Sequence, residues 1–137
     1  MNTLYTATAV ATGDGRNGRV ESTDGILSLN VRMPKEMGGA GGATNPEQLF
    51  AAGYAACFHS ALRLVARQSG ADVSDSEVVA DVSIGDKGGG FGLAVGLEVT
   101  LPSVAREDAQ KIVEMAHQVC PYSNATRGNI EVTLTVA

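Results

Sequence analysis

The stretch Ala43–Gly70, ATNPEQLFAAGYAACFHSALRLVARQSG, decides the fold because it predicts one long buried helix. Its start carries three helix signals: Asn45 as a cap, Pro46 at the first helical position, and Gln48 three residues after the cap. Gly70 suits the position just beyond a helix end. The middle of the stretch carries no formal charge, and its apolar side chains point to all sides of a helix. Such a helix is covered on most of its faces.

Cys57 lies in the middle of this helix, and two interpretations of it stand side by side. Free cysteines often only fill the core, and on position alone this is the favoured interpretation. A nucleophilic role requires a thiolate, which an apolar surround opposes and a helix dipole cannot support so far from the first turn. A reactive Cys57 therefore needs a cation from elsewhere in the fold. Arg63 is a poor candidate because it lies about 9 Å along the axis and on another face.

The rest of the chain alternates between strand patterns, glycine-rich turns and one amphipathic helix. Strands with alternating polarity are expected over 4–12, 19–22, 26–33, 77–85, 93–101 and 130–136, the first three as an antiparallel meander. The second helix is expected over 104–119 with Ser103 as its cap, and YSNATRGN after Pro121 is expected to be a turn. The order βββ-α-ββ-α-β predicts a single α+β domain over residues 1–137.

Composition and charge exclude several classes of protein. The chain has 137 residues and a net charge of −5, without a basic run, which argues against nucleic acid or an anionic membrane as partner. Its N-terminus lacks the pattern of a signal peptide. The uncharged stretch 49–62 is shorter than the ~20 residues that span a bilayer. We therefore expect a cytoplasmic protein, in which a bond between its two cysteines would be transient and chemical.

Three further residues could serve such chemistry. Arg16 lies in the turn GDGRNG at 13–18, where glycines could present it unusually, although a solvated turn arginine is the simpler interpretation. Glu47 is at the helix start, where any carboxylate is favourable, but it could also hold an arginine in a bidentate pair. Cys120 precedes Pro121 at a helix end that disfavours a thiolate, so it is the poorer attacker and the more natural resolving thiol. His59 and His117 show no metal-ligand spacing, so no metal site is expected.

Two long motifs carry a family resemblance. The segments GATNPEQLFAAGYAACF at 42–58 and VCPYSNATRGNIEV at 119–132, together with GRNG, MPKEMGGAGG and GGGFGLAV, resemble the Ohr group of the Ohr/OsmC proteins over nearly the whole chain. The resemblance implies a thiol peroxidase that acts on organic hydroperoxides. It implies an intertwined homodimer with a six-stranded sheet per subunit, in which antiparallel sheets pack around central helices.

The resemblance also implies roles for individual residues. Cys57 corresponds to the peroxidatic cysteine, Cys120 to the resolving cysteine, Arg16 to the thiolate-stabilising arginine and Glu47 to the glutamate that orients it. Because the turn ATGDGRNG is one residue longer than the family's usual turn, Arg19 is the alternative to Arg16. Apolar candidates for binding alkyl and lipid hydroperoxides are Phe50, Tyr54, Phe58, Met37 and Phe91.

The implied cycle needs no metal and no bound cofactor. Its reductant is dihydrolipoamide or a lipoylated protein. Glu47 and Cys57 are ten residues apart, about 15 Å along a straight helix. Either the helix is broken, or Glu47 and Arg16 reach the Cys57 of a partner chain, which we prefer. The competing functions are an OsmC-subgroup peroxidase and a non-catalytic dimeric protein that binds or senses peroxide.

Overall fold

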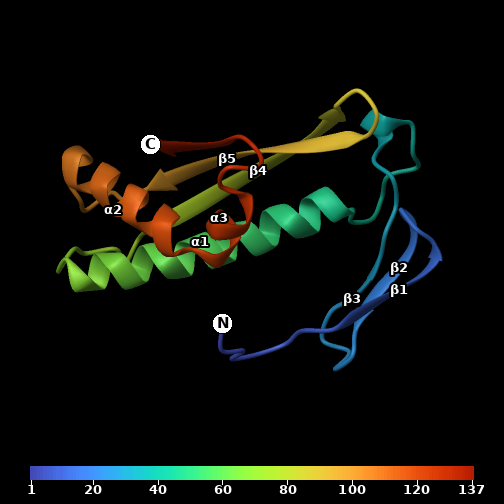
Figure 1. Ribbon diagram of the computed structural model, residues 1–137, viewed down its shortest axis with the longest axis horizontal. Coiled ribbons are helices and arrows are strands. Elements are labelled where there is room, and N and C mark those ends of the chain that lie inside the picture. The colour runs from blue at the N-terminus through green and yellow to red at the C-terminus, as the bar shows by residue number, and fades with distance from the viewer. The chain divides into compact units, whose positions relative to one another are not determined.

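The computed structural model describes residues 1–137, which divide into two compact units, Met1–Leu49 and Phe50–Ala137. Each unit carries its own three-stranded sheet, and helices α1, α2 and α3 follow in the chain order shown in Figure 1. One chain therefore holds two sheets of three strands, and the expected six-stranded sheet within a subunit is wrong. That the two units make one domain stays a prediction.

The first unit is a short antiparallel meander. Its strands are β1 (Ala9–Asp14), β2 (Asn17–Ser22) and β3 (Ser28–Asn30), followed by the 3₁₀ helix η1 (Lys35–Met37). The meander is confirmed, but β1 begins later and β3 is shorter than expected. The strand pattern continues through Asp14, which pairs with Asn17, so the turn shrinks to Gly15 and Arg16. Gly15 has φ +57°, which glycine adopts without a Cβ penalty.

Helix α1 (Pro46–Gln68) begins in the first unit and runs into the second without a break. Asn45 caps it, since Asn45 Oδ1 accepts the N–H of Gln48 at 2.8 Å. The Gln48 side chain binds Thr44 Oγ1 at 2.8 Å instead of completing a capping box. Gly70, with φ +72°, follows the helix end. The alternative of a broken helix is therefore wrong.

The second unit contains a mixed sheet. Its strands are β4 (Glu77–Asp86), β5 (Phe91–Thr100) and β6 (Val132–Val136). The hairpin of β4 and β5 is antiparallel as expected, but β6 runs parallel to β5, from the pair Val95 and Val132 to the pair Val99 and Val136. The expectation of purely antiparallel sheets is wrong here because two helices separate β5 from β6, and such a long crossover lets the chain return in the same direction.

Two helices form that crossover. α2 (Arg106–Val119) begins after Ala105, and no side chain caps it, so the expected Ser103 cap is wrong. α3 (Pro121–Thr126) occupies the segment that was expected to be a turn. Its first residue, Pro121, suits a helix start, and that signal was outweighed by the Ser, Asn and Gly residues that follow.

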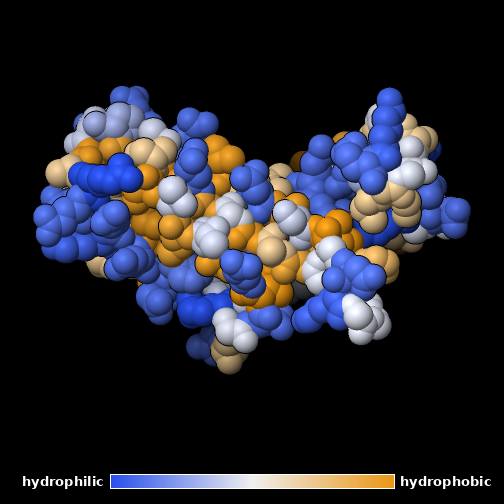
Figure 2. Space-filling view, turned by 90° about the horizontal axis from the view of Figure 1, so that it is seen from above, coloured by the Kyte–Doolittle hydropathy of each residue, from blue (hydrophilic) through white to orange (hydrophobic).

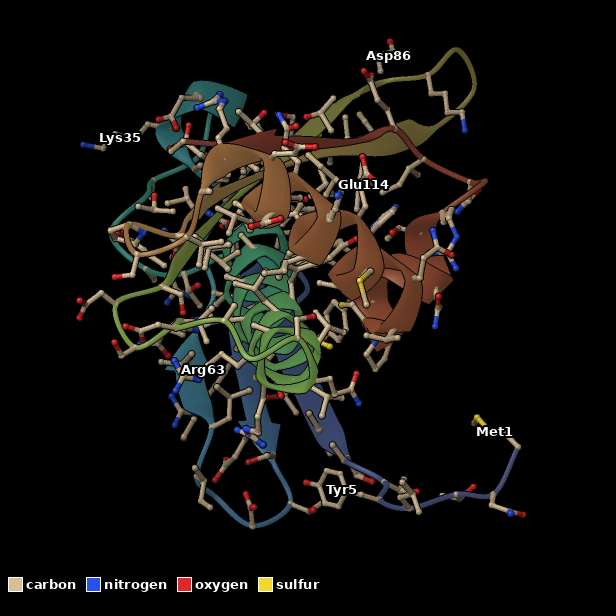
Figure 3. The ribbon with its side chains drawn as sticks, turned by 90° about the vertical axis from the view of Figure 1, so that its left-hand side faces the viewer. Met1, Tyr5, Lys35, Arg63, Asp86 and Glu114 are labelled. Carbon is tan, nitrogen blue, oxygen red and sulfur yellow. The ribbon has the colours of Figure 1, made fainter.

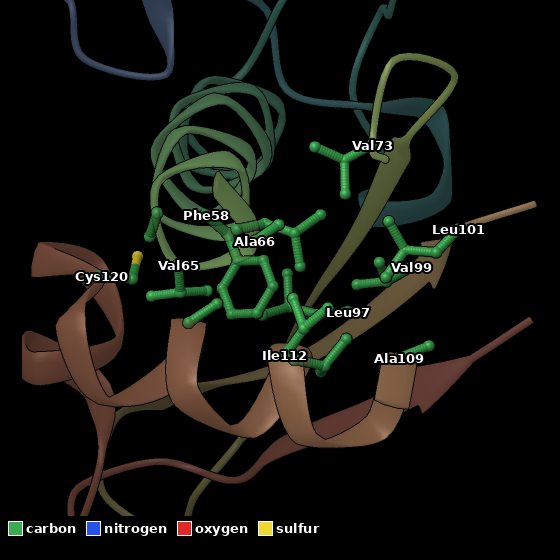
Figure 4. Close-up of a cluster of buried hydrophobic side chains, with 14 of the residues drawn as sticks. Phe58, Val65, Ala66, Val73, Leu97, Val99, Leu101, Ala109, Ile112 and Cys120 are labelled. Carbon is green, nitrogen blue, oxygen red and sulfur yellow. The ribbon is translucent and has the colours of Figure 1, made fainter. Parts of the chain in front are cut away.

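The core of the second unit lies between α1, the sheet and α2, as Figure 4 shows. α1 is long and apolar enough to cross a membrane by length and composition alone, but six of its residues are buried in this unit. Hydrophobic residues also lie at the surface among hydrophilic ones, as Figure 2 shows for one side. The cluster contains Tyr54, Phe58, Ala61, Leu62, Val65, Ala66, Val73, Val95, Leu97, Val99, Leu101, Ala109, Ile112, Val113, Ala116 and Cys120.

Candidate functional site

Two thiols that are 63 residues apart in sequence meet in the second unit. Cys57 comes from the middle of α1, and Cys120 lies between α2 and α3. Their sulfur atoms are 3.7 Å apart, which is thiol contact without a bond. Both cysteines are therefore free, and the fold brings them close enough to react with each other after a small approach.

The backbone at Cys120 is fixed by both neighbouring helices. Its N–H donates to Ala116 O at 2.9 Å, which ends α2, and its carbonyl accepts the N–H of Asn124 at 2.9 Å, which starts α3. Its side chain is fully buried, whereas Cys57 is half-buried. Cys120 thus lies at the junction of the two helices, and its backbone position depends on both.

The surroundings of Cys57 oppose ionisation. Burial raises the pKa of the Cys57 thiol above its usual value, and the neighbouring Cys120 raises it further. A hydrogen bond from the backbone N–H of Tyr122 has the opposite effect and lowers this pKa. The N–H belongs to α3, which sequence reasoning missed. Cys57 thus has one local donor, but its protonated form is favoured within this unit.

The first unit holds the charged pair. Arg16 Nη1 donates to Glu47 Oε2 and Arg16 Nη2 donates to Glu47 Oε1, both at 2.8 Å, in a bidentate arrangement. The side chains are 32% and 13% exposed. This hydrogen bonding lowers the pKa of Glu47 and raises the pKa of Arg16. Two of the five guanidinium N–H groups are occupied, so three can still donate to another anion.

The hairpin that carries Arg16 is held in place by its neighbours. Asn17 Oδ1 accepts the N–H of Met33 at 3.3 Å, and Arg32 Nη1 donates to Gly18 O at 3.0 Å. Gly18 has no room for a Cβ beside the Thr12 carbonyl. The turn is thus tied to the segment after β3, and Arg16 is presented from a fixed loop.

The alternative arginines are engaged elsewhere. Arg19 donates to Asn30 Oδ1 at 3.3 Å and also binds Ser28 Oγ, both within its own sheet. Arg63 extends from α1 and donates to the Val73 carbonyl at 2.8 Å, as its label in Figure 3 helps to locate. Of the three arginines, only Arg16 binds a carboxylate.

Three of the five predicted pocket residues belong to the hydrophobic cluster of the second unit or pack against it. Tyr54 and Phe58 are fully buried in the core of the second unit, and Phe50 is half-buried against it. Met37 belongs to η1 and is 36% exposed, and Phe91 starts β5 and is 75% exposed. Their roles in binding substrate stay a prediction.

An aromatic residue absent from that set lies close to Cys57. The Tyr122 ring lies with its centroid 5.9 Å from that of Phe50 and 5.6 Å from that of Tyr54. Gly53 makes this packing possible, since a Cβ there would lie 2.8 Å from Tyr122 Oη. Tyr122 stands inside the motif VCPYS, and the expectation of a turn after Pro121 concealed it.

The two histidines each lie in a separate local environment. His59 Nε2 is bonded to Ser76 Oγ at 2.8 Å, and burial lowers the pKa of His117, with Arg127 contributing to the same shift. The structure contains no group of three or more His, Cys, Asp or Glu residues that could hold a metal ion. A cavity of about 500 Å³ lies between residues 69–72 and 103–115, and neither cysteine lines it.

Known proteins resemble this chain over its whole length. Residues 39–135 match the family model described as OsmC-like protein. An organic hydroperoxide resistance protein of Xanthomonas axonopodis pv. citri is 54% identical over 136 residues, which are 98% of this chain and 95% of that protein.

Solved structures agree with this match. The crystal structure of an organic hydroperoxide resistance protein from Elizabethkingia anophelis is 57% identical with a TM-score of 0.94, covering 100% of this chain and 99% of that one. Another from Legionella pneumophila is 51% identical with a TM-score of 0.94, covering 99% of each chain. The predicted α+β fold class of the Ohr/OsmC type is thereby confirmed.

Proposed function

The chain belongs to the OsmC-like protein family, in its organic hydroperoxide resistance group, and we propose that it is a cysteine-based peroxidase of organic hydroperoxides. The observation that carries this proposal is the 3.7 Å approach of Cys57 and Cys120. Of the two thiols, Cys57 is the more exposed and receives the backbone N–H of Tyr122. It is therefore the nucleophile, and Cys120 resolves it.

Arg16 supplies the positive charge that the surroundings of Cys57 lack within the second unit. The pKa of Cys57 is raised by burial, so a nearby cation is needed to favour the thiolate. Arg16 is held at both Nη atoms by Glu47 and keeps N–H groups free. Arg19 is bonded within its own sheet, which favours Arg16 for this role.

The reaction then has three steps. The Cys57 thiolate attacks the O–O bond of the hydroperoxide, an alcohol leaves, and Cys57 becomes a sulfenic acid. Cys120 condenses with the sulfenic acid to form a disulfide, and water leaves. A dithiol such as dihydrolipoamide, free or carried on a lipoylated protein, reduces the disulfide by exchange and is itself oxidised to a disulfide. The apolar side chains around the half-buried Cys57 favour alkyl and lipid hydroperoxides over hydrogen peroxide.

We further propose that the working form is a cytoplasmic homodimer in which Arg16 and Glu47 serve the Cys57 of the partner subunit. α1 is continuous, so Glu47 and Cys57 of one chain are separated by about 15 Å along its axis.

A subunit-mixing experiment tests this arrangement. Arg16→Met and Cys57→Ser subunits, each inactive alone, should recover about a quarter of the wild-type activity when mixed in equal amounts, because half of the dimers regain one complete site. No recovery would place both residues of a site in one chain.

The function itself is tested by turnover. Purified protein is given tert-butyl hydroperoxide with either dihydrolipoamide or reduced thioredoxin, and the consumed peroxide is measured. We expect many equivalents to be consumed with dihydrolipoamide and few with thioredoxin. Consumption of only a single equivalent of peroxide per subunit with both donors would contradict the peroxidase and indicate a peroxide sensor. A strong preference for hydrogen peroxide would instead favour the chemistry of the OsmC subgroup.

A further inference from the structure

Buried hydroxyl groups join α1 to α3 close to both cysteines. Tyr54 Oη lies 2.8 Å from Ser123 Oγ and 3.0 Å from Thr126 Oγ1. Tyr54 precedes Cys57 by three residues on α1, and Ser123 follows Cys120 by three residues. On each side, therefore, the backbone of a hydroxyl residue lies about one helical turn from that of a cysteine.

This hydroxyl cluster, Tyr54, Ser123 and Thr126, is completely enclosed. Tyr54 and Ser123 are 0% exposed and Thr126 is 5% exposed, and the last two are the buried polar residues of the chain. Thr126 Oγ1 also bonds the Tyr122 carbonyl at 3.0 Å. A buried hydroxyl that keeps its partners adds little net stability over an apolar side chain, but one that loses a partner is costly. The gain from such a cluster is a defined geometry.

The element that the cluster fixes is the one that carries Cys120. α3 has only six residues, too few to persist without tertiary contacts, and it begins directly after Cys120. The Tyr122 ring, which packs against Tyr54, is partly exposed. The hydroxyl cluster is buried, and its hydrogen bonds depend on direction as well as distance. The cluster is therefore the contact that sets how far α3, and with it Cys120, stands from α1.

We propose that Tyr54, Ser123 and Thr126 are positioning residues that hold Cys120 against Cys57 and so favour disulfide formation over irreversible over-oxidation. The proposal rests on the peroxidase function proposed above. After the first step, the Cys120 sulfur attacks the Cys57 sulfenic sulfur. The S–S bond forms, the S–O bond breaks, and the oxygen leaves as water with the thiol proton.

A second hydroperoxide competes with this condensation. The Cys57 sulfenate attacks its O–O bond, gains one oxygen to become a sulfinic acid, and releases an alcohol. This reaction depends on peroxide concentration, but condensation within the chain does not. The peroxide concentration that converts half of the protein to sulfinic acid without reductant therefore measures the rate of condensation relative to over-oxidation.

The test uses Tyr54→Phe, which removes only the hydroxyl. Protein without reductant is treated with rising tert-butyl hydroperoxide, and intact mass distinguishes the disulfide, which lost two hydrogens, from the sulfinic acid, which gained two oxygens. We expect the half-conversion concentration to fall at least about fivefold, because the two hydrogen bonds of Tyr54 Oη are lost. Thr126→Val in a Cys120→Ser background measures over-oxidation alone and should leave its rate unchanged.

Thr126 supplies a matched pair of variants. Thr126→Val removes the hydroxyl at constant shape and should act like Tyr54→Phe, whereas Thr126→Ser keeps the hydroxyl and should restore the wild-type value. Tyr5→Phe removes a phenol hydroxyl from an 80% exposed ring and should change nothing. Val73→Ala, which removes buried contacts in the loop before β4, is the control for lower stability and should not alter the partition.

The outcomes separate this inference from the proposed function. If wild-type protein consumes peroxide and forms the disulfide, but Tyr54→Phe and Thr126→Val keep its half-conversion concentration, the positioning role is wrong. If wild-type protein forms neither the disulfide nor the sulfinic acid, the peroxidase itself is wrong. Should Tyr54→Phe fail to fold, the comparison of Thr126→Val with Thr126→Ser decides.

Discussion

The two units are stabilised by different kinds of interaction. In Met1–Leu49 only Val31 is buried, and the hairpin of Arg16 is held by hydrogen bonds and by glycine geometry. In Phe50–Ala137 six residues of α1 pack into a continuous hydrophobic cluster, and the hydroxyl groups of Tyr54, Ser123 and Thr126 are buried beside it. The ion pair of the first unit is thus partly exposed, whereas the thiols of the second unit lie in or against an apolar core.

This difference matches what the proposed chemistry needs. A thiol that selects organic hydroperoxides requires apolar surroundings, but those surroundings raise its pKa. An arginine and carboxylate pair placed in the same core would lose its hydration at a cost of several kcal/mol. Separating the charge from the thiol within the sequence lets each form in its own setting, and the proposed homodimer would then bring them together.

The first unit also exposes hydrophobic residues that a stable surface seldom leaves uncovered. Val10 is 53% exposed, Ile26 87% and Leu29 38%. A three-stranded sheet with so little burial is barely stable by itself. We expect the second copy of the proposed homodimer to cover these residues.

The largest effect on activity should come from a substitution in the second unit. Cys57→Ser removes the nucleophile and should lower the rate of peroxide consumption at least about 1,000-fold. Cys120→Ser should retain the first step, so that one equivalent of peroxide is consumed rapidly before over-oxidation. Stopped-flow measurement of peroxide loss distinguishes the two. Normal turnover of the Cys57→Ser protein would show that Cys57 is not the nucleophile.

A core truncation tests whether the packing really differs between the units. Leu97 is 1% exposed in the cluster, and Leu97→Ala should lower the free energy of unfolding by about 2–5 kcal/mol. Val31→Ala, at the one buried position of the first unit, should cost about 1–2 kcal/mol, because fewer methyl groups leave a smaller cavity. Urea unfolding measures both. Equal costs would mean that the two units are packed alike.

Loss of the charge should slow the reaction without unfolding either unit. Arg16→Met should reduce the rate constant for peroxide about 100-fold and raise the pKa of Cys57, since a cation favours the thiolate. The midpoint of pH-dependent alkylation should then move to higher pH. Arg19→Met is the matched control and should leave this midpoint unchanged. The reverse result would assign the role to Arg19.

A small steric change tests the contact between α1 and α3. Alanine normally stabilises a helix interior by about 1 kcal/mol over glycine, but a Cβ at Gly53 would press against Tyr122. Gly53→Ala should therefore leave the free energy of unfolding nearly unchanged. In a Tyr122→Ala background the same substitution should give the full gain. A full gain with Tyr122 present would show that the ring yields freely.

The smallest effect concerns how the stability of the first unit depends on acidic pH. Arg16 lowers the pKa of Glu47 in the folded protein, so the stability that this carboxylate contributes is present above its unfolded pKa and is lost as pH falls through the folded pKa. Since both side chains are partly exposed, we expect less than about 1 kcal/mol. Glu47→Gln should remove this part of the dependence of unfolding on acidic pH. An identical pH profile in the variant would argue that the pair adds no stability.

Local signals in the sequence predicted most of the fold. The cap at Asn45, the end at Gly70 and the period-two alternation of the strands each act within a few residues, and the structure confirms them. The parallel pairing of β6 could not be predicted in this way, because it depends on the path of α2 and α3 and on which side of β5 remains free. The ends of β3 were missed for the same reason, since strand ends depend on the partner strand.

The candidate residues show a similar division. Charge and turn geometry made Arg16 and Glu47 candidates, and their pairing over 31 residues is now visible as a bidentate contact. The hydroxyl cluster had no sequence signal, since isolated Tyr, Ser and Thr residues are common in any chain. Its three residues come into contact only because α3 packs on α1.

The long sequence separation of the two thiols has a consequence for the lifetime of the protein. A bond between Cys57 and Cys120 would close a loop of 63 residues and restrict the unfolded chain, which corresponds to about 4 kcal/mol of added stability in the chain-entropy model. The spent form would thus resist heat and proteases better than the form that is ready to react. In a cell that runs short of reductant, the protein would persist in its oxidised state and not be degraded.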